Sequence, residues 1–398
     1  MITKLSIGNV RSLDGLEYEF CPGINVICGP NGSGKTTVLE SAFVLAQGFS
    51  FRAKDLKEMV RWNCEELVMR ATFEFGGRKT VRALGLSLPY AGAARCKVSA
   101  KQDGEAVRSP ASFFGTCPAV IMQPSDIELL RGSPEVRRHW LDEILCFRSA
   151  ASAENLRRYK RILQQRNQWL RQFKKEGCAV GGEDMFQVLS RQLVELGAKL
   201  WMARINLSAE ISPVITGYYR RLSGGVDEIT CDYRSSILKD LDALDAADFL
   251  DTDDLDSVVA EPREEYDTGG PSEEMLRNAF AEKLADLEYV EKLQGVTMAG
   301  PHRDDLALCA SGYEMRSVGS QGQCRSAAIA MRFAAVDVAS QHVGKPILLL
   351  DDIFAELDVN RRDAVASLVR EKDCQVLIAT PQVEELPFKA DKEIPLGA

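Results

Sequence analysis

The sequence lacks the features that would indicate a membrane-bound or secreted protein. Its longest apolar stretches are far shorter than the roughly 20 residues that cross a bilayer, and charged or polar residues occupy the N-terminus, where a secretory leader would be apolar. Among 398 residues there are only three histidines, and the eleven cysteines include no CxxC pair, so neither a zinc site nor a disulfide framework is expected. We therefore expect a cytoplasmic protein with reduced cysteines and no membrane partner.

A phosphate-binding loop is the clearest positive signal. Residues 29–36 read GPNGSGKT, which fits the GxxxxGK(S/T) pattern at every fixed position, and the apolar residues 24–28 before them indicate a buried strand. In such loops backbone N–H groups surround the phosphates of a nucleoside triphosphate, the lysine adds positive charge, the next hydroxyl holds Mg²⁺, and a helix N-terminus faces the anion. The predicted ATP-binding residues of the loop are Gly29, Pro30, Asn31, Gly32, Ser33, Gly34, Lys35, Thr36 and Thr37.

The second half of the nucleotide site is predicted more than three hundred residues downstream. Four aliphatic residues, 347–350, end in Asp351 and Asp352. A strand buried on both faces reads as continuous aliphatics, and parallel sheets place ligands at the carboxyl ends of their strands. We expect Asp351 to hold Mg²⁺ and Asp352 to orient or deprotonate the attacking water, with Lys35 as the other catalytic residue. The alternative interpretation is a helix N-terminus with acidic residues.

A third motif precedes the helix-forming run 324–338. Ser320, Gln321, Gly322 and Gln323 resemble the signature motif of ABC-type ATPases, and residues 355–358, which end in Asp358, resemble the D-loop of the same class. The resemblance implies that the serine hydroxyl, the glycine amide and the helix N-terminus face the γ-phosphate bound by another copy of the chain. Two chains would then enclose two nucleotides, and one chain could not complete its own site.

Taken in order, these motifs resemble the RecF family of bacterial recombination mediators, which have an SMC-like ATPase head. The likeness rests on residues 4–12, 300–305, 320–323 and 350–358, and extends over nearly the whole chain. It implies ATP-dependent homodimerisation on gapped or duplex DNA and slow, DNA-stimulated ATP hydrolysis that acts as a timer. It also implies RecA loading through the partner RecR, in recombinational repair and replication restart.

Several residues stand at positions where related ATPases have functional groups. The resemblance to SMC-like heads implies that Arg11 contacts a phosphate, and a solvated strand end is an equal alternative. Gln123 lies where ABC proteins have a glutamine near Mg²⁺, but RecF-like chains often differ there, so its metal role is left open. Thr380 replaces a switch histidine; its hydroxyl can sense the γ-phosphate but cannot act as a base near neutral pH. Residues 300–305 either brace the nucleotide or signature helix, or form a turn with local ion pairs.

Charge is distributed unevenly along the chain. The net charge is −9, but residues 240–274 hold fourteen acids and one base, so the remainder carries +4. This acidic stretch indicates a weakly ordered insertion, either solvated and without a role or competing with DNA or docking a partner. Residues 131–175 hold twelve bases and four acids, which favours a sequence-independent DNA surface, with a solvated helix face as the alternative. The candidate DNA contacts are Arg137, Arg138, Arg157, Arg158, Lys160 and Arg161.

The pattern of apolar residues predicts an α/β fold with a mixed sheet, an antiparallel layer and an inserted helical lobe, and the resemblance implies that the sheet part is an ABC-type P-loop ATPase head. The head includes hairpins over residues 68–82 and 97–107 and core strands at 119–122, 347–350 and 376–379. Heptad-like spacing over 156–173 and 186–207 predicts a short antiparallel helical hairpin of two similar helices, the second ended by Pro213, with a third helix over 276–290. The expected divisions are residues 1–123, 124–295 and 296–398.

Two rival functions use the same phosphate-binding loop. One is the ATPase subunit of a membrane transporter, which a DNA-stimulated ATPase rate would disfavour. The other is a phosphotransferase that acts on a small acceptor, but such an enzyme has no use for the motif at residues 320–323.

Overall fold

Five parallel strands form the sheet that positions the site. The computed structural model describes residues 1–89, 96–113, 117–225, 228–235, 237–239, 270–384 and 386–397. The order of the five strands in the sheet is β14-β3-β13-β12-β8. The strands are β3 (Ile24–Cys28), β8 (Ala119–Met122), β12 (Ile347–Asp351), β13 (Gln375–Thr380) and β14 (Lys392–Pro395). The three predicted core strands are confirmed, and they join segments from both ends of the chain. Because all five strands are parallel, their carboxyl ends meet at one edge.

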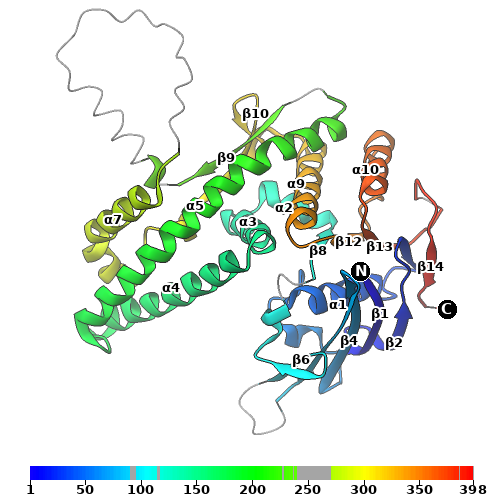
Figure 1. Ribbon diagram of the computed structural model, residues 1–398, viewed down its shortest axis with the longest axis horizontal. Coiled ribbons are helices and arrows are strands. Elements are labelled where there is room, and N and C mark those ends of the chain that lie inside the picture. The colour runs from blue at the N-terminus through cyan, green and yellow to red at the C-terminus, as the bar shows by residue number, and fades with distance from the viewer. Residues whose placement is uncertain are drawn as a thin grey trace, which may run out of the picture.

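An antiparallel sheet forms the second layer of the head, in the order β2-β1-β4-β5-β6-β7. Its strands are β1 (Ile2–Val10), β2 (Leu13–Glu19), β4 (Glu66–Phe75), β5 (Arg78–Ser87), β6 (Lys97–Gln102) and β7 (Glu105–Val107), so both predicted hairpins are confirmed. Helix α1 (Lys35–Gln47) is buried along almost its whole length, and its side chains share one core with residues of both sheets (Figure 1). The phosphate-binding loop is therefore held between two layers.

The long helices form a lobe on the other side of the molecule (Figure 1). They are α3 (Pro134–Arg148), α4 (Ala150–Glu176), α5 (Gly182–Ser223) and α7 (Glu273–Gln294). A short loop joins α4 to α5, and the two run side by side in opposite directions, with the Trp169 and Phe186 rings 4.6 Å apart. Two short helical segments, η3 (Pro124–Ile127) and α2 (Glu128–Arg131), lead from β8 of the head into the lobe. Two others lie within the head: η1 (Leu56–Met59) and η2 (Pro110–Phe113).

The predictions for the second helix of this pair were wrong in two respects. Helix α5 continues through Pro213 to Ser223, and it has 42 residues against 27 in α4, so the two helices are not of similar length. Proline removes one backbone hydrogen bond and crowds the preceding turn. Here Ile211 and Ile215 on either side of it are fully buried in the main core, so packing maintains the helix.

A small third sheet joins the lobe to the C-terminal part of the head. It consists of β9 (Ile229–Arg234), β10 (Asp305–Ala310) and β11 (Tyr313–Glu314), and β9 pairs with β10 across the division expected at residues 295 and 296. The segment η4 (Pro301–Arg303) directly precedes β10, and β11 is followed by α8 (Met315–Val318), α9 (Gln321–His342) and α10 (Val359–Glu371). One core cluster includes residues of α3, α5, α7, α9 and the central sheet.

Residues 240–269, the main part of the acidic stretch, lie outside the described residues, so the structure does not test either interpretation of it. Within the described ranges, no helix combines the length and the apolarity that a membrane span requires.

Candidate nucleotide site

The loop between β3 and α1 turns over the carboxyl edge of the central sheet. Gly29 has a φ of 153°, and a Cβ there would lie 2.3 Å from the Leu396 carbonyl oxygen. Gly34 has a φ of 99° directly before α1, and a Cβ there would lie 2.6 Å from Leu13 Cδ2. Both positions therefore require glycine. Pro30, Asn31 and Gly32 are exposed, Ser33 is half-buried, and Thr37 is buried in the first turn of α1.

The Lys35 ammonium is folded back over this loop. Its Nζ donates hydrogen bonds to the carbonyl oxygens of Gly29 at 2.7 Å and Pro30 at 2.9 Å, and the residue is buried. The positive charge is thus held beside the positive end of α1, where the backbone N–H groups of the loop converge on an anion.

Thr36 and Asp351 bring the two halves of the site together. The Thr36 hydroxyl donates a 2.8 Å hydrogen bond to Asp351 Oδ1. Burial raises the pKa of the Asp351 carboxyl, while its bond to Thr36 and the charge of Arg52 act in the opposite direction. A hydroxyl and a carboxylate are hard oxygen ligands, which Mg²⁺ combines with nucleotide phosphates and water. The residues present therefore fit this ion.

Asp352 and Thr380, two more of the predicted residues, lie at the same edge of the sheet. Asp352 follows β12 with a φ of 53°, and its N–H donates to the Ala379 carbonyl at 2.9 Å. Thr380 ends β13 opposite Cys28, and its hydroxyl donates to the Gln382 carbonyl at 3.1 Å. Strand register therefore brings Asp352 and Thr380 beside the phosphate-binding loop.

Gln123 follows β8 at the same edge, because Met122 pairs with Leu350 in the neighbouring strand. The Gln123 N–H donates to Asp126 Oδ2 at 2.9 Å, and Asp126 Oδ1 in turn accepts a 2.8 Å hydrogen bond from Arg332 of α9. This connects the edge of the sheet to the helix that follows the signature motif. A contact between Gln123 and Mg²⁺ stays a prediction.

Arg11 is bound to the helix of the phosphate-binding loop and is not a solvated strand end. Its guanidinium donates to both carboxylate oxygens of Glu40 in α1, at 2.6 and 2.8 Å, and Glu40 is fully buried. The hydrogen bond to Glu40 raises the pKa of Arg11. Its role as a phosphate contact stays a prediction.

Arg52 is a residue that sequence reasoning missed. It lies in the loop after α1, with its NH1 atom 3.9 Å from Glu40 Oε2, and its charge acts on the Asp351 carboxyl. A single arginine in an irregular segment has no distinguishing pattern, so only the fold reveals its proximity to the site.

The signature motif begins α9 and is exposed at its first two residues. The Ser320 hydroxyl accepts a 3.2 Å hydrogen bond from the Gln323 N–H, and the Gln323 side chain accepts one of 2.9 Å from the Ser320 N–H. This reciprocal arrangement satisfies two donors at the helix terminus. Ser320 and Gln321 are exposed, Gly322 and Gln323 are partly buried, and Cys324 is fully buried.

The D-loop is attached to this helix by two arginines. Arg325 of α9 donates to the Glu356 carbonyl at 2.6 Å and is also ion-paired with its carboxylate. Asp358 begins α10 and binds Arg361, whose Nε donates to Ser326 Oγ at 3.0 Å. A Cβ on Gly322 would lie 2.9 Å from the Arg361 guanidinium, so glycine permits this close approach. The signature helix and D-loop therefore form one unit.

The motif at residues 300–305 braces the helical lobe. His302 Nδ1 lies 2.7 Å from the Tyr159 hydroxyl of α4, and Arg204 of α5 donates to the Pro301 carbonyl at 2.6 Å. Asp304 accepts hydrogen bonds from Trp201 and Tyr233. The partners are distant in sequence and belong to the lobe, so the structure favours a structural role but not the predicted local ion pairs.

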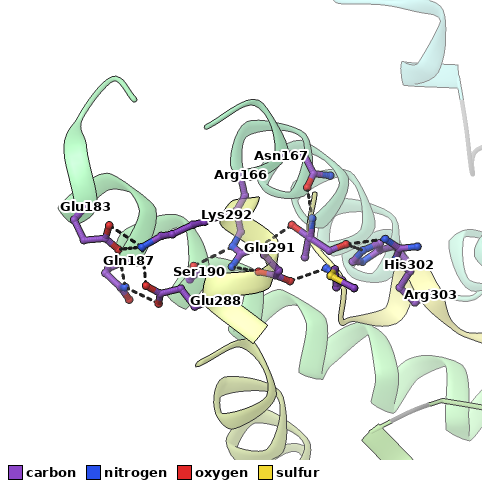
Figure 2. Close-up of polar contacts among 12 residues, drawn as sticks. Arg166, Asn167, Glu183, Gln187, Ser190, Glu288, Glu291, Lys292, His302 and Arg303 are labelled. Carbon is purple, nitrogen blue, oxygen red and sulfur yellow. Dashed lines mark hydrogen bonds and ion pairs between the residues drawn. The ribbon is translucent and has the colours of Figure 1, made fainter. Parts of the chain in front are cut away.

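Figure 2 shows the buried polar cluster beside this motif. Arg166 of α4 forms a 2.7 Å ion pair with Glu291 of α7, and both side chains are almost completely buried. Arg166 also donates to Thr297 Oγ1 at 2.8 Å, and the Thr297 carbonyl lies 3.2 Å from His302 Nε2. The predicted apolar seam of α4 thus contains a cation whose partner comes from a third helix.

The six candidate DNA contacts do not share one environment. Arg137 is buried and binds Asp305 through two hydrogen bonds of 2.7 and 2.9 Å, which removes it from the candidate DNA surface. Arg138 is partly buried, and its guanidinium donates to the Asp304 carbonyl. The other four residues are exposed on α4: Arg157, Arg158, Lys160 and Arg161.

Comparisons with known proteins agree with this architecture. Residues 4–81 match a family model described as AAA domain. A protein of Symbiobacterium thermophilum named DNA replication and repair protein RecF is 33% identical, over 97% of this chain and 92% of that protein. A protein of Heliobacterium modesticaldum with the same name is 34% identical, over 95% and 92%.

Two solved structures show the same fold. A structure of the recombination mediator protein RecF-ATP in the RecFOR pathway has a TM-score of 0.82 at 24% identity and covers 99% of this chain and 95% of its own. A structure of an SmcHead bound to the C-winged helix domain of ScpA has a TM-score of 0.52 at 15% identity, and covers 100% and 94%.

Proposed function

Because this chain belongs to the RecF family of DNA replication and repair proteins, we propose that it is an ATP-gated DNA-binding protein of recombinational repair and replication restart. ATP holds two copies together on gapped or duplex DNA, and hydrolysis releases them. In this scheme the homodimer acts with RecR and promotes RecA loading. ATP turnover is slow, is stimulated by DNA and serves as a timer.

The observation that carries the proposal is the exposed start of α9 in a chain that also holds a P-loop and an acidic strand end. Signature motifs act on a bound nucleotide, but in this chain Ser320 and Gln321 are exposed on the surface. An exposed helix N-terminus can receive the γ-phosphate bound by a second copy. Two copies related by a two-fold axis would each supply this terminus to the other, which closes the assembly.

The residues at the sheet edge supply the parts that phosphoryl transfer to water needs. Backbone N–H groups of residues 31–36 and the Lys35 ammonium bind the phosphates. Thr36 and Asp351 would hold Mg²⁺, which would neutralise charge that develops on the phosphate oxygens. Asp352 orients or deprotonates the water. The Thr380 hydroxyl senses the γ-phosphate, a role supported by the pairing of Thr380 with Cys28, directly before the phosphate-binding loop.

The contacts of α9 support coupling between nucleotide and DNA. Through Arg332 and Asp126 the helix reaches the residues after β8, and through Arg325 and Arg361 it reaches the D-loop. Its other face packs against α5 of the helical lobe, within one core. A change at the nucleotide edge is therefore transmitted to the lobe, which we propose to be residues 124–295 inserted between head segments 1–123 and 296–398.

The experiment that tests the proposal measures two quantities on the purified full chain. Mass in solution is determined with and without ATP, and affinity is determined for gapped and blunt duplex DNA. We expect ATP to double the mass and to strengthen DNA binding, and Lys35→Ala to abolish both effects. Lys57→Ala, which removes an exposed lysine of η1, serves as the control. Equal dimerisation of the Lys35→Ala protein, or binding to DNA that ignores ATP, would refute the proposal.

A further inference from the structure

An exposed groove of about 500 Å³ runs between α4 and α5, away from the nucleotide edge. Arg158 and Arg161 of α4 line one side, and Arg191 and Lys199 of α5 line the other. Arg158 and Arg161 are three positions apart and therefore neighbours on the surface of α4, while Arg191 and Lys199, eight positions apart, fall within one broad stripe of α5. Arg158 and Arg161 were predicted from the sequence as DNA contacts, and Arg191 and Lys199 were not.

The register of the two helices brings these four bases together. Arg166 Nε donates to Ser190 Oγ at 3.0 Å, and the Trp169 and Phe186 rings pack against each other. These buried contacts fix α4 against α5, so the outer groove has rigid walls. Its basic side chains are therefore presented by a preformed surface.

Among the residues that the structure describes, the four bases have no acidic partner, whereas two neighbouring bases do. Arg157 pairs with Glu154 at 3.1 Å, and Lys160 pairs with Asp142 at 3.1 Å. Over the part of the chain that the structure describes, no carboxylate oxygen lies within 4.0 Å of the cationic nitrogens of the four groove bases, which are Arg158, Arg161, Arg191 and Lys199.

The one acidic residue among the described residues that line the groove leaves it with a net positive charge. Glu195 lies among the four bases, but its carboxylate is 3.9 Å from Arg277 of α7 on the opposite side. The amides of Gln165 and Gln192 also line the groove and add neutral hydrogen-bond donors, and Ile162 and Leu196 are its apolar lining residues. A concentration of positive charge with amide donors is suited to the oxygens of a polyanion.

We propose that this α4–α5 groove binds the phosphate backbone of DNA. The inference rests on the proposed function and specifies where the DNA contact lies. Arg191 and Lys199 are about 12 Å apart along the helix axis, a length that corresponds to about three to four phosphate spacings of one DNA strand. The lining offers cations and amides to phosphate oxygens, so binding is independent of sequence and sensitive to salt.

The test compares two full-length variants with the same change of charge. Arg158→Gln with Arg191→Gln removes one base from each wall of the groove. Arg171→Gln with Lys175→Gln removes two exposed bases from the C-terminal part of α4, outside the groove. Affinity for a fluorescent duplex is measured with ATP at several salt concentrations, and mass in solution with ATP reports on dimerisation.

We expect the groove variant to bind duplex at least about tenfold more weakly at 0.1 M salt and to reduce the slope of log affinity against log salt by about 2. Its ATP-dependent mass should match that of the unchanged protein, and the control variant should retain both affinity and slope. Equal weakening in the two variants, or no weakening in the groove variant, would overturn the groove assignment while leaving ATP-dependent DNA binding intact.

Two other outcomes separate the inference from the proposed function. If the unchanged protein binds no duplex with ATP, the proposed function fails and the groove assignment fails with it. If polyglutamate binds the unchanged protein but not the groove variant, while both bind duplex equally, the groove is a site for acidic protein segments and the DNA assignment is overturned.

Discussion

The Thr36 hydroxyl donates a 2.8 Å hydrogen bond to the Asp351 carboxylate across 315 residues of sequence. This contact joins the first residues of α1 to the end of β12, and it places a hydroxyl and a carboxylate where Mg²⁺ would bind. The pairing is the most direct sign that the two nucleotide-binding segments form one site.

Thr36→Ala should therefore weaken ATP binding in a Mg²⁺-dependent manner. A hydrogen bond to a charged group contributes about 1.5–3 kcal/mol, so we expect at least about a tenfold loss of affinity. Calorimetric titration with ATP in Mg²⁺ and in EDTA measures this loss, and Thr36→Ser is the matched control. An equal loss in EDTA would show that the hydroxyl acts on the fold and not on the metal.

Asp352→Asn should retain ATP binding but slow hydrolysis. The amide preserves the size of the side chain but cannot accept a proton from water, and general-base catalysis contributes about 10²- to 10⁴-fold. Phosphate release measures the rate, and the lifetime of the DNA-bound dimer should increase in parallel. Rapid turnover by this variant would assign the base to another residue.

Ser320→Arg should block hydrolysis of the ATP bound by the partner copy, and not of the ATP bound by the chain that carries the substitution. A mixture of Ser320→Arg and Lys35→Ala chains can form dimers with one intact composite site, so ATPase activity should reappear although each variant alone is inactive. The measurement is phosphate release at constant total protein as the mixing ratio changes. Ser320→Thr, which keeps a capping hydroxyl, is the control. Turnover by the Ser320→Arg protein alone that is independent of concentration would contradict a shared site.

Arg166→Met should destabilise the lobe strongly, because it leaves the Glu291 carboxylate buried without its ion pair. Breaking one side of a buried pair costs about 3–5 kcal/mol of unfolding free energy, whereas replacing both partners by apolar groups is often neutral. Arg166→Met with Glu291→Met should therefore recover most of the loss in urea unfolding. Arg220→Met breaks the exposed pair with Glu228 and should cost less than about 1 kcal/mol. A double variant as unstable as the single one would point to hydrogen bonds outside the pair.

His302 should make folding stability depend on pH in the mildly acidic range. Burial, together with the charge of Arg303, lowers the pKa of this histidine to about 4. The unfolded chain, with a histidine pKa of about 6.5, binds the proton first as the pH falls. Stability contributed by neutral His302 is thus present above pH 6.5 and is lost progressively between about pH 6.5 and 4. In thermal unfolding, the His302→Asn variant should lose less stability between pH 6.5 and 4 than the unchanged protein does. The control variant His342→Asn, which changes an exposed histidine, should lose as much stability as the unchanged protein.

Features specified by local pattern were predictable from the sequence. The strands at 119–122, 347–350 and 376–379 are continuous and aliphatic, and the phosphate-binding loop contains glycines that backbone geometry requires. The start of α9 carries its own capping residues, Ser320 and Gln323. In each case the signal lies within a few neighbouring residues.

Features that depend on distant partners were not predictable. The basic run indicated a surface, but Arg137 is neutralised by Asp305, 168 residues away. Pro213 marked a helix end by local propensity, and core packing against α9 overrides it. Strand β14 is short and contains a proline, so no pattern identified it, and Arg52 reaches the site only because of the fold.

The unbroken course of α5 has a mechanical consequence. With 42 residues, the helix is about 63 Å long, and a straight rod of that length converts a pivot of about 5° at one end into a displacement of about 5 Å at the other. Its C-terminal half packs on α9, while its N-terminal half carries Arg191. A small rotation of α5 at the end that packs on α9 would thus displace its N-terminal end by several ångströms. Pro213, which local propensity predicts to end the helix, lies within this continuous helix.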